Sequence, residues 1–234
     1  MINKLKLLTA TAVFTLLSAC GGGDGGVSGP VASTESFNLK TVWGNILTTP
    51  STNKVTVSGT GKEGAITGSG TDTYSNLSAG TFEGNTWQKQ TQTIAVSLVT
   101  NGQTIPINES YDTWVDGSNY APKGETSVSS NYVVVTGTGT LPTAARINDT
   151  ATLYTANRYA DSTKAVLKGT RTVSYVLEAD TASTALLSLL FEDKSGLNET
   201  TSKSTAQFRI TTTGAFTRIK ATSVEGATTL IFTY

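Results

Sequence analysis

Apolar and polar residues alternate in short runs along most of the chain, and clusters of Gly, Pro, Asn and Asp separate the runs. Val55 and Val57 stand two residues apart, as do Val173, Tyr175 and Leu177 farther along. Side chains of a β-strand point alternately to opposite faces, so this spacing puts the apolar residues of a run on one face. The pattern predicts an all-β protein. Strands are expected around residues 53–61, 92–99, 130–139, 151–156, 164–170, 171–180, 206–214, 216–223 and 228–234.

Two segments depart from this alternation. In residues 40–49, Trp43, Ile46 and Leu47 recur at helical intervals, which predicts a short helical turn. Residues 181–193 fit a helix and a buried strand equally well, because their apolar positions match both periods. We therefore expect at most one or two short helices.

A strand that ends in a glycine turn recurs at intervals of roughly 75–80 residues. Its copies are VTVSGTG at 55–61, VVVTGTG at 133–139 and FRITTTG at 208–214. A second pair, TIAVSL and TVSYVL, recurs at a similar interval. The expected fold is thus an antiparallel sandwich or two related β units, with the first unit in residues 36–131 and the second in 132–234.

The chain begins with features of a secretory signal peptide. Lys4 and Lys6 precede an uncharged run, LLTATAVFTLL, and small residues follow that run. The run is too short to span a bilayer, which takes roughly 20 apolar residues. Residues 1–19 are therefore expected to be a signal peptide.

The sequence Leu17-Ser18-Ala19-Cys20 resembles the lipobox of bacterial lipoproteins. The resemblance implies cleavage after Ala19, a diacylglycerol on the Cys20 sulfur and a further acyl chain such as palmitate on the new amine, so that covalent lipid holds the protein on a membrane. Gly21, rather than an aspartate, follows the cysteine, and by the same resemblance this favours the outer membrane of a Gram-negative bacterium. Glycine-rich residues 20–35 then form a flexible tether. The mature part is similar to uncharacterised proteobacterial lipoproteins.

Composition removes several classes of function. The chain has 234 residues, no histidine, and equal numbers of basic and acidic side chains, 17 of each. Without histidine it holds no Ser-His-Asp site and no zinc site built on histidine. The balanced charge argues against a nucleic-acid partner. We expect no cofactor, no metal and no enzymatic activity; Ser51-x-x-Lys54 matches a motif of penicillin-recognising enzymes, but it runs straight into a predicted strand.

The best candidate for a binding site is the stretch Tyr111–Tyr120, in which aromatic and polar side chains crowd together. Aromatic faces beside hydrogen-bonding groups are typical of sugar binding and of protein interfaces. The alternative is that Tyr111 and Trp114 are core residues of a strand. The candidate ligand-binding residues are Tyr111, Asp112, Trp114, Asp116 and Tyr120.

Other acidic residues and the C-terminus carry weaker signals. Glu192 and Asp193 are expected on a surface loop, as are Glu109 and Asp112. The final residues, LIFTY, alternate towards a terminal aromatic as in outer-membrane barrels, but aromatic residues make up only 8% of the chain, too few for the aromatic girdles of such barrels. We expect the last strand of a sandwich there.

These observations favour a non-catalytic, lipid-anchored protein of the cell envelope that serves in binding, adhesion or structural support, with an envelope glycan or protein as its partner. The alternative is a glycan-binding or glycan-active module that uses the Tyr111–Tyr120 loop.

Overall fold

The computed structural model describes residues 32–127 and 131–234, which form one antiparallel β-sheet and one α-helix. The helix, α1, spans Leu39–Thr48. The all-β prediction is confirmed. The strands are β1 (Ser51–Gly61), β2 (Gly64–Tyr74), β3 (Ser78–Phe82), β4 (Asn85–Thr100), β5 (Gln103–Val115), β6 (Pro122–Ser127), β7 (Tyr132–Thr138), β8 (Thr150–Tyr159), β9 (Leu167–Ala179), β10 (Thr184–Ser195), β11 (Thr200–Thr211), β12 (Phe216–Glu225) and β13 (Thr228–Thr233).

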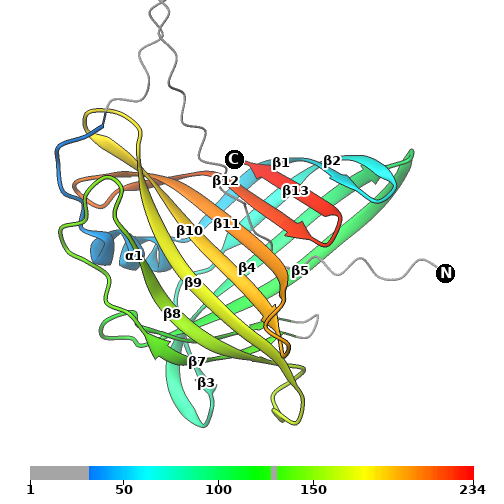
Figure 1. Ribbon diagram of the computed structural model, residues 1–234, viewed down its shortest axis with the longest axis horizontal. Coiled ribbons are helices and arrows are strands. Elements are labelled where there is room, and N and C mark those ends of the chain that lie inside the picture. The colour runs from blue at the N-terminus through cyan, green and yellow to red at the C-terminus, as the bar shows by residue number, and fades with distance from the viewer. Residues whose placement is uncertain (1–31, 128–130) are drawn as a thin grey trace, which may run out of the picture.

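The sheet closes on itself as a barrel (Figure 1). Strands β4 to β13 follow one another as a meander, β13 pairs with β1, and β1 pairs with β2. Pairing of β2 with β4, in which Thr71 lies opposite Ala95, completes a ring of 12 strands within the described residues. Strand β3 lies outside this ring and pairs with the first residues of β4.

The predicted sandwich is therefore wrong. Alternation along a strand shows that one of its faces is buried, but a second sheet or the far wall of the same sheet can cover that face equally well. Residues 36–131 and 132–234 both contribute strands to this one closed sheet. Their descent from a common unit stays a prediction.

Most apolar side chains of the strands point into the barrel, and most of the side chains between them are polar and point out. On β1, Val55 and Val57 are buried, while the intervening Thr56 and Ser58 are exposed. At the C-terminus, Leu230 and Phe232 of β13 belong to the same core as these valines. The barrel interior is thus the hydrophobic core, and the alternation of the last strand serves that core.

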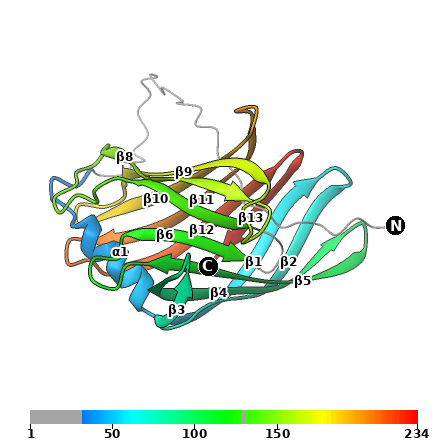
Figure 2. The ribbon, with the colours of Figure 1, turned by 90° about the horizontal axis from the view of Figure 1, so that it is seen from below.

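Helix α1 lies across one end of the barrel (Figures 1 and 2). The side chain of Asn38 caps it by accepting a hydrogen bond from the Thr41 amide at 3.0 Å. It ends just before Pro50, since the residue preceding a proline avoids the helical conformation. Its buried face, which includes Leu39 and Val42, packs in one cluster with residues of β8 to β11. The predicted helical turn is confirmed, and it acts as a plug.

A second hydrophobic cluster fills the interior between β1, β2, β4, β5 and β13. There β2 and β4 approach very closely: a Cβ atom on Gly70 would lie 2.1 Å from the Ala95 carbonyl oxygen. Only glycine fits at this point, and the approach lets the barrel close tightly around the cluster.

Gly59 and Gly64 lie in the hairpin that joins β1 to β2. Residues 181–193, which fitted two periods, supply most of strand β10. Over the described ranges, 32–127 and 131–234, none of the helical structure is long and apolar enough to cross a membrane.

Candidate functional site

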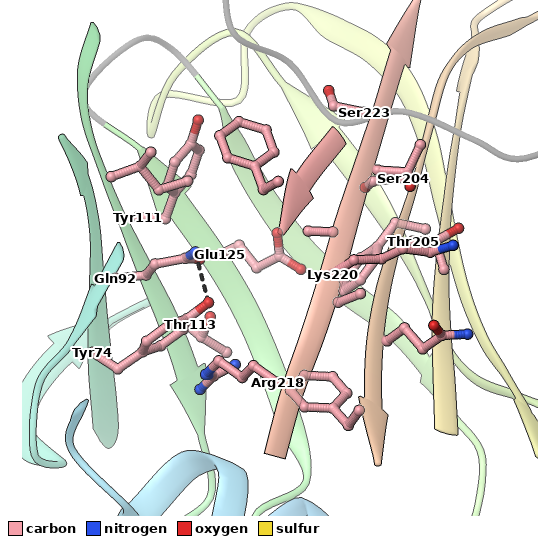
Figure 3. A pocket seen from close by; sticks show the side chains of 18 of the residues that line it. Tyr74, Gln92, Tyr111, Thr113, Glu125, Ser204, Thr205, Arg218, Lys220 and Ser223 are labelled. Carbon is pink, nitrogen blue, oxygen red and sulfur yellow. Dashed lines mark hydrogen bonds between the residues drawn. The ribbon is translucent and has the colours of Figure 1, made fainter. Parts of the chain in front are cut away.

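A cavity of about 250 Å³ lies inside the barrel, lined by residues from both hydrophobic clusters. Figure 3 shows it with α1 beneath and strands on both sides. Its volume approaches the lower end of small-ligand pockets, roughly 300–1,000 Å³. Aromatic side chains supply much of the wall: Trp43, Tyr74, Tyr111, Tyr154, Phe191, Phe208, Phe232 and Tyr234.

One polar group of the interior surrounds the carboxylate of Asp72, which is 1% exposed. It accepts hydrogen bonds from the hydroxyls of Tyr74 (2.8 Å) and Tyr234 (2.6 Å) and from Nε2 of Gln92 (3.0 Å). These three donors are neutral hydroxyl and amide groups, and the positive charge of Arg218 lies close to the same two tyrosines. Burial raises the pKa of the Tyr74 hydroxyl well above its usual range, and the neighbouring Tyr234 and Asp72 add to this effect.

Arg218 enters the cavity from β12, directly over the ring of Tyr74. Its Cζ lies 3.5 Å from the Tyr74 ring centroid and 5.3 Å from that of Phe208, which is cation–π geometry. Its Nη2 is buried and has no hydrogen-bond partner among residues 32–127 and 131–234. Buried polar atoms in proteins almost always have a partner, so this nitrogen marks a place where an acceptor is missing.

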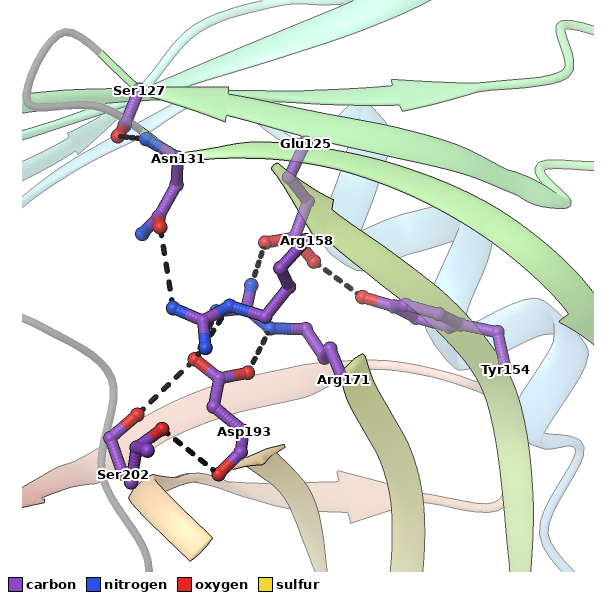
Figure 4. A network of polar contacts seen from close by, with 9 residues as sticks. Glu125, Ser127, Asn131, Tyr154, Arg158, Arg171, Asp193 and Ser202 are labelled. Carbon is purple, nitrogen blue, oxygen red and sulfur yellow. Dashed lines mark hydrogen bonds and ion pairs between the residues drawn. The ribbon is translucent and has the colours of Figure 1, made fainter. Parts of the chain in front are cut away.

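A second polar group joins β6, β8, β9 and β10 (Figure 4). Asp193 accepts hydrogen bonds from Nε (2.7 Å) and Nη2 (2.9 Å) of Arg171, and its Oδ2 lies 3.3 Å from Nε of Arg158. Glu125 binds Nη1 of Arg171 and accepts a hydrogen bond of 2.5 Å from the Tyr154 hydroxyl. We call these five residues the Arg171 network. Its two arginines and two carboxylates balance in charge.

Burial makes this network sensitive to the loss of any member. Asp193 is 0% exposed and Arg171 3% exposed. Burial alone would lower the pKa of Arg171. The carboxylates of Glu125 and Asp193 raise it by more than burial lowers it, so the guanidinium stays charged. Burial raises the pKa of Tyr154 well above its usual range, and Glu125 adds to the rise. The network therefore holds fixed charges beside the cavity.

The structure separates the predicted binding residues. Tyr111 and Asp112 both lie on β5, where Tyr111 lines the cavity and Asp112 forms an ion pair of 3.0 Å with Lys89. Trp114 is only 7% exposed and stacks on Phe82 of β3, with the ring centroids 5.4 Å apart. Its place under β3 matches the alternative that it is a core residue.

The other two members lie in the turn after β5. Asp116 binds the backbone and side chain of Ser118, and these hydrogen bonds lower its pKa. The Tyr120 ring lies against Gly44 of α1, and its carbonyl accepts a hydrogen bond from Nε1 of Trp43 at 2.9 Å. Tyr120 thus helps to attach the plug helix. The five residues do not share one surface.

Several interior residues were missed by sequence reasoning. Asp193, expected on a surface loop, is buried, and that expectation is wrong. The sequence does indicate its burial, because Leu187, Leu189 and Phe191 precede Asp193 at alternate positions of β10 and therefore lie on the same face of the strand. Arg171 precedes Val173 in the same way on β9. A charge in phase with buried apolar residues indicates an interior ion pair.

Cys20, the predicted lipidation site, and residues 1–31 as a whole lie outside the described residues. Within the described part of the chain, no group of three His, Cys, Asp or Glu side chains is placed to hold a metal ion. No protein-family model, no curated protein and no solved structure matches this chain. Its function is therefore inferred from the site itself.

Proposed function

We propose that this chain is a lipid-anchored protein of the bacterial cell envelope that binds a small molecule inside its barrel without transforming it. The observation that carries the proposal is the cavity of about 250 Å³, which lies between the strands and is lined by aromatic rings and a few polar groups. Such a combination of apolar walls and few oriented polar groups is typical of small-ligand sites. The Asp72 group and the Arg171 network supply those polar groups.

The anchor is testable through the one cysteine of the chain. Changing Cys20→Ala in the full chain should abolish palmitate labelling and release the protein from membranes, because no other thiol remains to carry a diacylglycerol. Ser28→Ala, in the same tether, should leave labelling and attachment unchanged. Membrane attachment of the Cys20→Ala protein would contradict the lipid anchor.

The cavity is testable with 2-naphthamide, a neutral aromatic ligand, titrated by calorimetry into the full chain carrying Cys20→Ala, so that no acyl chain competes. Ala206 lines the cavity, whereas Ala95 is exposed on the outside of β4. Filling the cavity by Ala206→Phe should weaken binding at least about tenfold, equivalent to ~1.4 kcal/mol. Ala95→Phe adds the same ring outside and should leave binding unchanged.

Failure of naphthamide to bind, or equal binding by both phenylalanine variants, would exclude the cavity as the binding site. The glycan alternative gains no support from the placement of its residues, since only Tyr111 of the five lines the cavity. Circular dichroism of each variant shows whether the barrel is intact before binding is compared.

A further inference from the structure

We infer that the cavity selects small aromatic carboxylates and that Arg218 binds the carboxylate group. This inference rests on the proposed function, since it names the class of ligand for the same cavity. It begins from the Nη2 atom of Arg218, which is buried without a hydrogen-bond partner among the described residues. A carboxylate oxygen of a ligand would supply the missing acceptor, and the planar guanidinium matches the planar carboxylate.

The charges around the cavity leave Arg218 available for an anion. Asp72 is already held by two tyrosine hydroxyls and Gln92. Glu125 is held by Arg171 and Tyr154. Within residues 32–127 and 131–234, no carboxylate forms an ion pair with Arg218. Lys220 also borders the cavity, but it is exposed to solvent and adds little to the charge inside.

The walls favour an aromatic body for the ligand. Aromatic rings stack on one another in offset or edge-on arrangements, and Tyr74, Phe208 and Phe232 all line the space. An apolar cavity of ~150 Å³ accepts benzene. At about 250 Å³ this cavity has room for a fused or substituted ring but not for a long acyl chain. With one unpaired guanidinium beside apolar walls, it fits a monoanion better than a phosphate.

The test compares 2-naphthoate with 2-naphthamide, which have the same ring and differ in charge. The full chain carrying Cys20→Ala should bind naphthoate about tenfold or more tightly than the amide, because a hydrogen bond to a charged group is worth that much. Arg218→Met should remove this preference. Arg209→Met, which removes an exposed arginine from the neighbouring strand β11, should preserve it.

Each outcome decides between the two proposals. Equal binding of both ligands by the unmodified cavity, or a preference that survives Arg218→Met, would overturn the inference and leave the proposed function standing. Absence of binding by both ligands would overturn the proposed function as well. Should Arg218→Met fail to fold, Arg218→Lys serves instead, because it keeps the positive charge and removes the planar pair of guanidinium donors. Naphthoate binding should then weaken severalfold while naphthamide still binds.

Discussion

Replacing Asp193 with asparagine is expected to lower the free energy of unfolding by about 3–5 kcal/mol, the range for breaking a buried ion pair. Asp193 is fully buried and faces two arginines, Arg171 and Arg158. After the substitution, Glu125 would be the one carboxylate of the Arg171 network left beside its two guanidinium groups. The amide has nearly the shape of the carboxylate, so the loss reflects the missing charge and one missing hydrogen-bond acceptor, and not a cavity. Urea denaturation followed by circular dichroism measures it.

Asp180→Asn is the matched control for this change. Asp180 also binds an arginine through both oxygens, at 2.6 and 3.0 Å, but the side chain of Arg209 is 48% exposed. Exposed pairs contribute ~0–1 kcal/mol, so this variant should lose little. Adding Arg158→Met to Asp193→Asn restores charge balance and should recover part of the stability. Equal losses of unfolding free energy for the Asp193 and Asp180 variants would show that the Arg171 network stabilises the fold no more than an exposed ion pair does.

The sequence predicts the strands of this protein better than their assembly. Val55 and Val57, or Val173 and Tyr175, reveal the buried face of a strand because period-two alternation is a local property. Closure of the barrel depends instead on twist accumulated over many strands and on the pairing of β2 with β4. That pairing uses Gly70, whose role is visible only when the opposite backbone is in place. A sandwich and a barrel therefore share the same one-dimensional pattern.

The interior charges escaped prediction for a different reason. Residues 181–193 fitted a helix as well as a strand, and Asp193 is in phase with Leu189 and Phe191 only if the segment is a strand. A β-bulge hides the interior position of Arg218 from sequence reasoning. Phe208 lies opposite Arg218 and Gln207 lies opposite Lys220, so Ile219 is the extra residue of the bulge. Alternation alone would have placed Ile219 inside. A bulge reverses which residues of a strand face the interior, and the sequence shows no clear signal of where it occurs.

Raising the pH above 10 is expected to unfold the barrel, with ionisation of its interior tyrosines as the cause. Burial raises the pKa of Tyr74, Tyr111, Tyr154 and Tyr234 above the usual value. Below about pH 10 these hydroxyls are protonated in both states, so their contribution to stability is complete. Above it the unfolded chain releases protons that the folded chain retains, and stability falls.

The size of this effect follows from proton linkage. Each pH unit above 10 lowers the free energy of unfolding by ~1 kcal/mol for every phenol that stays neutral in the folded state. Over one to two pH units, four such phenols together lower the free energy of unfolding by an amount comparable with the whole stability of a domain, which is about 5–15 kcal/mol. Tyrosinate absorbance and circular dichroism, recorded in one titration, should therefore change together in a single steep transition.

Tyr111→Phe separates this cause from general alkaline damage, because it keeps the ring in the cavity wall and removes one titrating hydroxyl. Compared with the unmodified chain, this variant should lose less free energy of unfolding between pH 7 and pH 11, whatever its stability at pH 7. Gradual ionisation of the four tyrosines near pH 10, with the circular dichroism of the barrel unchanged, would show that their hydroxyls reach solvent. In that case the interior would be a water-filled space, and the aromatic wall proposed for ligand binding would lose its physical basis.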